Sequence, residues 1–364
     1  METLALNAFG SAYRGCRALV TGHTGFKGSW LCLWLQTLGA EVTGLALDPP
    51  TEPSHWDLLK LEMNDHRVDI RDEAAVRRVF TDARPEVVFH LAAQPLVRRS
   101  YRKPVETWAT NVMGTAHVLE AARHEPEVRA VVVVTSDKCY ENREWPWAYR
   151  ERDRLGGHDP YSASKAGAEL VAASYRSAFL QQPSAPLLAT ARGGNVIGGG
   201  DWSEDRLIPD LVRSVGAGDP LVIRSPRATR PWQHVLDCLS GYLLVGQRLL
   251  ANDVTSAGAW NFGPDGEGNR TVEQVLQALV STWPQLQWRV TADPQPHEAG
   301  LLQLDSAKAK MQLGWRPVWN IQQAIHHTAN WYRLMLESGE PPSVDQLAAY
   351  IADATTTGLD WASA

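Results

Sequence analysis

The sequence predicts an α/β fold built on a doubly wound parallel sheet, with a smaller α/β lobe toward the C-terminus. Two observations predict it. Short apolar, β-branched runs alternate with stretches of helical periodicity along the first two-thirds of the chain, and a Gly-rich turn follows the first run. Near-continuous apolar runs are typical of parallel strands covered on both faces. Their alternation with helices predicts right-handed crossovers.

Five apolar runs are expected to form strands of this sheet: 16–22, 41–48, 86–93, 128–136 and 186–195. The stretches with helical spacing between them are 28–40, 73–83, 104–125 and 161–180. Strand and helix in this order predict a Rossmann-like domain, in which ligands bind at the carboxyl ends of the strands.

The sequence changes character after about Asn195, where Gly-rich and basic loops begin. We expect a short strand and a basic loop within 220–235, a helix over 235–251 and one more strand over 259–264. The tail 344–364 is expected to be one helix followed by disorder. The predicted division is a dinucleotide-binding domain of 1–192 plus about 233–263, and a partly interleaved substrate lobe of about 193–232 plus 264–364.

Composition excludes several classes of protein. Lys plus Arg is 35 and Asp plus Glu is 41 in 364 residues, a net charge of −6, which weighs against nucleic acid or an anionic membrane as a partner. No apolar run approaches the roughly 18 residues of a membrane-spanning helix, and the opening 17 residues lack the pattern of a secretory signal. We expect a cytoplasmic protein.

The four cysteines form no C-x-x-C pair and no His-rich metal spacing, so we expect reduced thiols and no metal. Cys139 has two interpretations. It follows a predicted strand end beside an acid and an amine, which suits a nucleophile, but a small apolar filler is the commoner role at such a place and is favoured.

The turn "TGHTGFKGSW" places Gly22, Gly25 and Gly28 between the first strand and the first helix. Glycines let the backbone approach a pyrophosphate, and the helix N-terminus supplies unpaired N–H groups. The spacing is G-x-x-G-x-x-G rather than G-x-G-x-x-G. This turn predicts a dinucleotide site.

Asp48 ends the second predicted strand, 20 residues after Gly28. A carboxylate there accepts hydrogen bonds from the adenosine ribose hydroxyls and repels a 2′-phosphate, which favours NAD over NADP. The alternative is a solvated acid at a strand end. Asp69 and Ile70 follow where they would flank the adenine, a weaker prediction.

Tyr161 and Lys165 fall at i and i+4 of a predicted helix that Asp159 caps and Pro160 opens. A phenol is a poor base at neutral pH, but a neighbouring ammonium favours the phenolate. Y-x-x-x-K alone occurs by chance in many helices. Its combination with the glycine turn and with Thr-Ser at a strand end indicates a catalytic site.

These motifs, with "HLAAQPLVRRSY", "TSDKCY", "RGGNVIGGGDW", "DRLIPD" and "RPWQHVLD", resemble the nucleotide-sugar 4,6-dehydratases of the extended short-chain dehydrogenase/reductase family over nearly the whole chain. The resemblance implies NAD as cofactor, a nucleotide-sugar substrate and a homodimer. It implies the triad Ser136, Tyr161 and Lys165. The cofactor residues implied, besides Tyr161 and Lys165, are Gly22, Thr24, Gly25, Phe26, Lys27, Gly28, Asp48, Asp69, Ile70, Leu91, Ala92, Ala93 and Asn111.

The resemblance also implies a substrate site. Asn195 and Arg230 match residues that bind the diphosphate, since a guanidinium donates two parallel hydrogen bonds. Gln94, Arg206 and His297 are expected to line the nucleotide or the sugar. For any one arginine the alternative is a solvated surface charge.

Asp137 and Lys138 suit a dehydratase, which must remove water across C5–C6 with an acid and a base in addition to the triad. By resemblance Asp137 is the acid that protonates the C6 hydroxyl, and Lys138 stands where members acting on dTDP-glucose have a glutamate base. Asp-Lys occurs in members that act on CDP-glucose, the substrate we expect. A lysine must be neutral to accept a proton, and burial beside a cationic nicotinamide would lower its pKa. The alternative is a surface ion pair between Asp137 and Lys138.

Two further alternatives remain at this stage. One is a 4-epimerase, or a 4,6-dehydratase acting on UDP-N-acetylglucosamine or dTDP-glucose. The other is a non-catalytic NAD-sensing protein, since a fold alone does not give a function; that interpretation expects a broken triad. We also expect the 104–124 and 161–180 helices, apolar around much of their circumference, to pair with their copies in a dimer.

Overall fold

The computed structural model describes residues 7–223, 225–291 and 301–363. Its centre is a seven-stranded sheet in the order β11–β6–β5–β4–β1–β2–β3, and every neighbouring pair is parallel. The strands are β1 (Arg17–Thr21), β2 (Glu41–Ala46), β3 (Asn64–Arg67), β4 (Val87–His90), β5 (Ala130–Val134), β6 (Leu187–Gly193) and β11 (Ala259–Phe262). The order reverses at β1 and β4, as in a Rossmann-like fold.

All five strands predicted in the first two-thirds of the chain, and the one predicted over 259–264, form this sheet. The edge strand β3 was not predicted, because Asn-Asp-His-Arg has no apolar residue and is exposed along most of its length. Its pairing with β2 extends the sheet on the side of the cofactor's predicted adenosine end.

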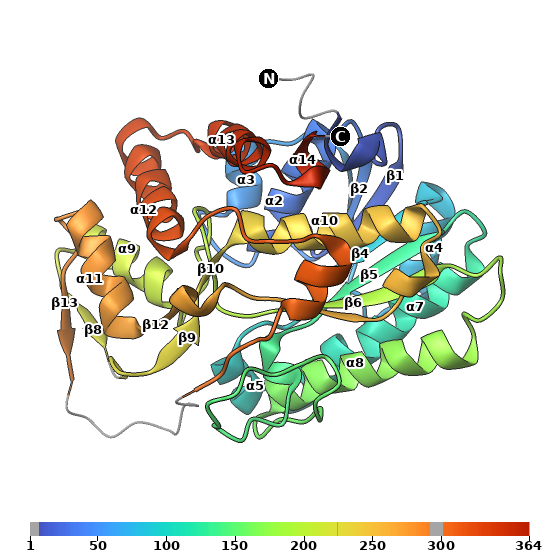
Figure 1. Ribbon diagram of the computed structural model, residues 1–364, viewed down its shortest axis with the longest axis horizontal. Helices are drawn as coiled ribbons and strands as arrows, with labels where there is room; N and C mark the ends of the chain where they lie inside the picture. The colour runs from blue at the N-terminus through green and yellow to red at the C-terminus, as the bar shows by residue number, and fades with distance from the viewer. Residues whose placement is uncertain (1–6, 224, 292–300, 364) are drawn as a thin grey trace.

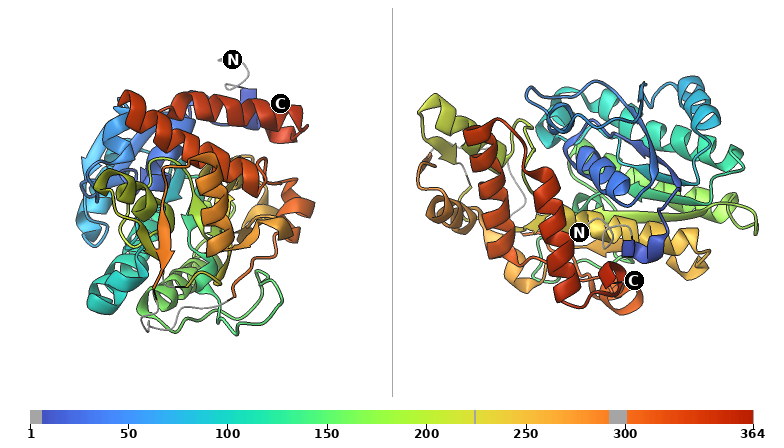
Figure 2. Two further views of the ribbon diagram at one scale, coloured as in Figure 1. Left: turned by 90° about the vertical axis from the view of Figure 1, so that its left-hand side faces the viewer. Right: turned by 90° about the horizontal axis from the view of Figure 1, so that it is seen from above.

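Helices cover both faces of the sheet (Figures 1 and 2). On one face lie α4 (Glu73–Ala83), α7 (Gly114–His124) and α8 (Pro160–Ala178), and on the other α2 (Phe26–Thr37) and α10 (Val235–Leu250). Each of these faces has its own apolar core. The all-apolar strands are therefore buried on both sides, as their sequences predict.

The stretch 104–125, predicted as one helix, consists of α6 (Pro104–Trp108), the π-helical turn η2 (Ala109–Met113) and α7. The chain continues through the three without leaving helical dihedral angles at the joints. The π turn holds the buried Asn111, one of the predicted cofactor residues.

Most elements outside the main sheet gather beyond one end of it (Figure 1, left). They include α9 (Leu207–Ala217), α11 (Val272–Thr282), α12 (Ile321–Ser338) and two small sheets, in which β8 (Leu221–Ile223) pairs with β13 (Trp288–Val290) and β9 (Thr229–Pro231) with β12 (Asn269–Thr271). β7 (Val196–Ile197) pairs with β10 (Gln233–His234). The domain division given above stays a prediction.

The remaining elements are helix α13 (Ser343–Thr356) and the short segments η1 (Ala8–Ser11), α3 (His55–Leu59), α5 (Val97–Arg102), η3 (Asp137–Cys139), η4 (Val254–Ser256), η5 (Gly266–Gly268), η6 (Ala309–Leu313) and α14 (Asp360–Ser363). No helix of the described residues is long and apolar enough to cross a membrane.

The C-terminal tail corrects one expectation. Instead of disorder after the first helix, residues up to Ser363 are folded, and α14 buries Trp361. The indole stacks on Phe9 of η1, with ring centroids 4.8 Å apart, and meets Trp34 of α2 edge-on. A large aromatic side chain buries enough apolar area to hold a short helix in place, and η1 and α14 therefore both lie on the α2 side of the sheet.

Candidate active site

A cleft with a volume of about 2000 Å³ opens at the carboxyl ends of β1, β4, β5 and β6. Its opposite wall comes from the segment 195–213 and from residues around β9. Apart from Asn111 and from His297, which lies outside the described residues, every residue predicted for the cofactor, the chemistry or the substrate lines this cleft. The volume exceeds the usual 300–1,000 Å³ of a single small-molecule site.

The glycine turn forms the floor at the β1 end of the cleft. A Cβ atom on Gly22, whose φ is +75°, would lie 2.7 Å from the Ala92 backbone nitrogen, and one on Gly28 would lie 2.1 Å from the Gly22 carbonyl oxygen. No side chain caps the N-terminus of α2 at Gly25. The first-turn N–H groups therefore face the cleft uncovered, an arrangement that fits a pyrophosphate.

Asp48 stands at the end of β2 with 91% of its side chain exposed at the edge of the cleft. The guanidinium of Arg67, at the end of the unpredicted strand β3, lies 3.9 Å from the Asp48 carboxylate. Arg67 also donates a hydrogen bond to the Leu47 carbonyl at 3.0 Å. The adenosine end of the cleft therefore has both a carboxylate and a guanidinium.

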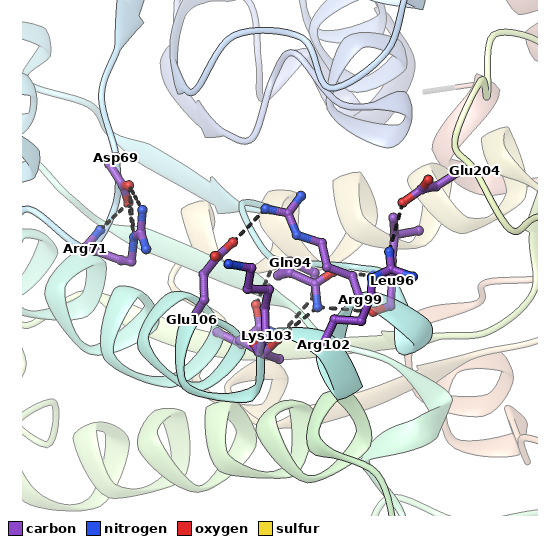
Figure 3. A network of polar contacts seen from close by, with 11 residues as sticks. Asp69, Arg71, Gln94, Leu96, Arg99, Arg102, Lys103, Glu106 and Glu204 are labelled. Atoms are coloured by element: carbon purple, nitrogen blue, oxygen red, sulfur yellow. Dashed lines mark hydrogen bonds and ion pairs between the residues drawn. The ribbon is translucent and has the colours of Figure 1, made fainter.

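The two residues predicted to flank the adenine are both firmly held. Arg71 pairs with Asp69 through several hydrogen bonds, the shortest 2.5 Å, and lowers the pKa of the Asp69 carboxyl (Figure 3). Ile70 is buried, and its side chain occupies the place that a Cβ on Gly114 of α7 would need.

Ser136, Asp137 and Lys138 lie at the end of β5, in the turn η3. The Ser136 hydroxyl donates to the Asp137 carboxylate at 2.9 Å and accepts from the Lys138 backbone N–H at 3.2 Å. Asp137 is 1% exposed. The described residues contain no ion pair between Asp137 and Lys138, and a buried acid does not suit the surface-pair interpretation.

Asp137 has a second oxygen, Oδ2, that is buried and has no hydrogen-bond partner among the described residues. It lies against the backbone of Gly194, where a Cβ would approach within 2.1 Å. A buried carboxylate oxygen without a partner is costly. A hydrogen-bond donor from outside the chain would therefore stabilise this carboxylate.

Tyr161 and Lys165 project from the first two turns of α8. As predicted, Asp159 caps this helix through the Ser162 backbone N–H at 2.9 Å, and Pro160 is its first residue. The Lys165 ammonium donates to the Val134 carbonyl of β5 at 3.3 Å. Both side chains are buried at the base of the cleft.

Burial dominates the ionisation of this pair. It raises the pKa of Tyr161 to about 12, while the Ser136 hydroxyl and the charge of Arg206 act in the lowering direction and Asp137 in the raising direction. Burial lowers the pKa of Lys165 to about 8, assisted by the positive charge of Lys27. The free protein therefore keeps Tyr161 as a phenol at neutral pH.

A buried ion pair that the sequence did not predict anchors α8. Glu169, two turns after Tyr161, pairs with Arg192 of β6 at 2.7 Å, and both side chains are 3% exposed. Thr135 and Thr190 donate further hydrogen bonds to the carboxylate at 2.5 and 2.8 Å. Removing one partner of such a pair is strongly destabilising, so it fixes the helix that carries Tyr161.

Asn111 lies beneath the cleft rather than in its wall. Its amide accepts from the Gln94 backbone N–H at 2.7 Å, donates to the Gln94 carbonyl at 3.1 Å and donates to Ser164 at 2.8 Å. These contacts tie α8 to the turn after β4. Contact of Asn111 with the cofactor stays a prediction.

Gln94 lines the cleft, but its side-chain amide is used within the protein. It accepts from the Leu96 N–H at 2.7 Å and donates to Thr107 at 3.0 Å (Figure 3). Little of the Gln94 side chain is therefore left to contact a substrate, and its substrate role stays a prediction.

The opposite wall presents polar groups toward the triad. The Asn195 amide oxygen is buried without a hydrogen-bond partner among the described residues. Arg206 pairs with Asp201 at 2.9 Å and faces Tyr161 closely enough for their charges to interact. Arg230 lies in β9 and lines the cleft.

Cys139 is fully buried in a small apolar cluster, and burial raises the pKa of its thiol well above the usual value. The filler interpretation is confirmed over the nucleophile. All four cysteines are buried and unpaired.

The family model for GDP-mannose 4,6 dehydratase matches residues 19–328. The chain belongs to this family. A curated relative, the CDP-glucose 4,6-dehydratase of Salmonella typhimurium, is 49% identical over 328 residues, which cover 88% of this chain and 91% of the relative.

Solved structures of similar proteins share the fold. The dTDP-glucose 4,6-dehydratase DesIV of Streptomyces venezuelae, solved with NAD bound, is 26% identical with a TM-score of 0.73, covering 90% of this chain and 99% of that one. An epimerase of Methanothermobacter thermautotrophicus is 25% identical with a TM-score of 0.80, covering 92% and 97%. The predicted fold class and family are confirmed.

Proposed function

We propose that this chain is an NAD-dependent CDP-glucose 4,6-dehydratase. It converts CDP-glucose to CDP-4-dehydro-6-deoxyglucose and water, without net oxidation. The carrying observation is that Asp137 and Lys138, the two groups a dehydratase needs beyond a triad, lie in one cleft with Ser136, Tyr161 and Lys165. The 49% identical relative carries the name of the same activity.

The cofactor end of the cleft fits NAD. The backbone of Gly22 and Gly28 leaves no room for a Cβ yet stays open to a diphosphate, and Asp48 is free to meet ribose hydroxyls. Lys165 would hold the nicotinamide ribose. When bound, NAD would supply reversible hydride storage between C4 and C6 of the sugar.

Tyr161 takes the proton of the C4 hydroxyl. Its phenol needs positive charge nearby to do so at neutral pH, because burial raises its pKa to about 12. The charge of Arg206 and a hydrogen bond with Ser136 both lower the pKa of this phenol, and Lys165 adds a cation one turn later on α8. The resulting ketone at C4 acidifies the C5–H bond.

Lys138 then removes the C5 proton, and Asp137 protonates the departing C6 hydroxyl. The partnerless Asp137 oxygen against Gly194 supports this role, because the C6 hydroxyl would supply the hydrogen bond it lacks. Lys138 lines the same cleft one residue away. Among the described residues, no carboxylate lies within 4 Å of its side-chain nitrogen.

On the substrate side, Asn195 and Arg230 bind the diphosphate and Arg206 reaches the sugar. The position of both side chains on the cleft wall supports this assignment, because the Asn195 amide N–H groups and the Arg230 guanidinium can donate to phosphate oxygens. The proposed substrate contacts therefore lie within residues 195–230, which agrees with the predicted start of the substrate lobe near 193.

We infer a homodimer through α6, η2, α7 and α8. Large apolar side chains on these elements are exposed, among them Val105 at 79% and Leu170 at 61%, together with Trp108 and Met113. Such a patch marks an association surface.

Leu170→Asp should give a monomer by light scattering. Leu336→Asp on α12, another exposed leucine, should remain dimeric. A monomeric wild type would contradict the inference. The cytoplasm stays the predicted location.

A 4-epimerase is the second candidate, because UDP-glucose 4-epimerases of solved structure share this fold. The test is product analysis with CDP-, dTDP-, UDP- and GDP-hexoses. We expect a 4-keto-6-deoxy product from CDP-glucose and little turnover of the others. Recovery of a C4 epimer without loss of water would overturn the dehydratase.

A further inference from the structure

Two ion pairs join opposite walls of the cleft near its mouth. Arg98 of α5 pairs with Asp205 at 2.7 Å, and Arg102, one turn later, pairs with Glu204 at 3.5 Å. Figure 3 shows Arg102 reaching Glu204. All four residues line the cleft. We refer to these two pairs as the clasp.

The α5 side of the clasp is anchored to the sheet. The helix begins just beyond Leu91–Ala93, the turn after β4 that is expected to lie against the cofactor. The Gln94 side chain bonds both the start of α5 and Thr107 of α6. Arg99 pairs with Glu106 at 2.6 Å within one wall, so this pair is no part of the clasp (Figure 3).

The loop side is anchored to the other wall. Asp201, nearly buried, accepts from the Ser203 N–H at 3.0 Å and from Arg206 at 2.9 Å, and its carbonyl accepts from Tyr332 of α12 at 2.5 Å. Asp205 has a left-handed backbone, φ 57°, which few residues other than glycine adopt without support. Its ion pair with Arg98 supplies part of that support.

The loop between these anchors carries Arg206, whose guanidinium faces Tyr161. The clasp therefore fixes both the position of a cation beside the proposed catalytic base and the distance between the walls that enclose the ligands. A dehydratase that returns its hydride to the same sugar must keep the reduced cofactor and the keto sugar together until the end of the cycle. A link across the mouth serves that requirement.

We propose that Arg98 and Arg102 are positioning residues that hold the 201–206 loop across the cleft and so retain the reduced cofactor between C4 oxidation and hydride return. This role rests on the proposed function. Both pairs are partly exposed to solvent. Each contributes modestly and is weakened by salt.

The test is the dissociation rate of NADH, measured by stopped-flow fluorescence on the full chain without sugar nucleotide. For Arg98→Gln/Arg102→Gln we expect a rate about threefold to tenfold faster than wild type at low salt, and a difference that shrinks near 1 M salt, where screening is nearly complete. Arg99→Gln, which breaks a pair within one wall, should release NADH at the wild-type rate.

Exchanging the two charges of one ion pair tests whether faster NADH release comes from loss of that pair or from a folding defect. Arg102→Glu should release NADH faster, and the double variant Arg102→Glu/Glu204→Arg should return toward the wild-type rate. During turnover of CDP-glucose, the Gln double variant should also leak free NADH and come to depend on added NAD, a readout that a loss of stability alone would not produce.

The outcomes separate the two proposals. If wild type binds NADH and the clasp variants release it at the wild-type rate, or the charge exchange restores nothing, the clasp is wrong and the dehydratase is untouched. If the variants leak NADH but CDP-glucose gives no 4-keto-6-deoxy product, the proposed function is wrong while the link between walls stands.

Discussion

At the cofactor end of the cleft, the predicted ligand contacts come from turns that directly follow β1, β2 and β4, whereas at the sugar end they come from segments spread over 194–230. The first set consists largely of backbone and glycines placed by the sheet. The second consists of long polar side chains placed by ion pairs and buried hydrogen bonds, such as Arg206 on Asp201.

This difference indicates where each end tolerates change. A glycine whose missing Cβ makes room for the backbone has no substitute, because every other residue adds the atom that clashes. A side chain held by ion pairs can be replaced at a graded cost. Function at the cofactor end therefore depends on shape, and function at the sugar end depends on charge and on which proton donors are present.

The largest effects are expected where the two ends meet. Asp137→Asn and Lys138→Met should each slow turnover by about 10²–10⁴-fold, yet still oxidise C4, because both groups act only at elimination. They should accumulate NADH and a 4-keto sugar. Tyr161→Phe should slow turnover similarly but show no NADH. Single-turnover absorbance at the NADH band distinguishes the two results.

Deuterated water provides the matching wild-type measurement: C5 of the product should gain one deuterium, since the proton removed there is replaced from solvent. If Lys138→Met forms no NADH, or turns over at the wild-type rate, Lys138 is not the elimination base. The role of Asp137 is tested separately by Asp137→Asn.

At the cofactor end, one added carbon atom should be enough to weaken NADH binding. Gly28→Ala places a Cβ 2.1 Å from the Gly22 carbonyl oxygen, whereas Gly25→Ala meets that oxygen at an ordinary 3.4 Å. Overpacking of about 1–3 kcal/mol corresponds to roughly tenfold to a hundredfold in the dissociation constant of NADH. We expect this loss for Gly28→Ala and only a small change for Gly25→Ala, measured by fluorescence titration.

A control lies outside the site: Gly266→Ala, with open space around its Cβ position, should bind NADH normally. Equal affinities for Gly28→Ala and Gly25→Ala would mean that backbone contact with the diphosphate is not what the glycines provide.

The same contrast explains what the sequence could predict of the fold. Buried parallel strands such as Ala130–Val134 are apolar throughout, so the sheet was predicted strand by strand. β3 was not predicted because an exposed edge strand needs no apolar residue. The folded tail was missed because Trp361 is buried by Phe9, more than 300 residues earlier, and no local pattern indicates such a contact.

For the site, local motifs predicted the glycine turn, the triad and the Asp-Lys pair, and the structure brings these together in one cleft. Contacts between distant segments were not predicted. Arg67 beside Asp48, and the Glu169–Arg192 pair behind α8, each join elements that only the fold brings together. His297 lies outside the described residues, so its role stays a prediction.

A smaller effect is expected at Asp48. Removing this carboxylate removes its repulsion of a 2′-phosphate, while Arg67, held by Asp65 at 2.6 Å, still places a guanidinium at the adenosine end. Asp48→Ala should therefore improve NADP binding relative to NAD by about tenfold, the value of one charge-assisted hydrogen bond, without an added arginine. Titration of both cofactors against wild type and Asp48→Ala/Arg67→Gln measures it. A wild type that prefers NADP would refute the role of Asp48.

The smallest effect is expected between the two ends. Lys27 belongs to the glycine turn, but its ammonium lies 3.4 Å from the Tyr242 hydroxyl and its charge lowers the pKa of Lys165, which burial already brings to about 8. If the Lys165 ammonium holds the nicotinamide ribose, NADH affinity should fall as pH rises through about 8, because the ammonium is lost.

Lys27→Met should move that fall to higher pH by a fraction of a unit, since burial remains and only the repulsion is removed. NADH titrations between about pH 6 and 10 measure the shift, with Lys103→Met on the α5–α6 turn as the control. A fall at the same pH in Lys27→Met and wild type would mean that the charge of Lys27 does not act on Lys165.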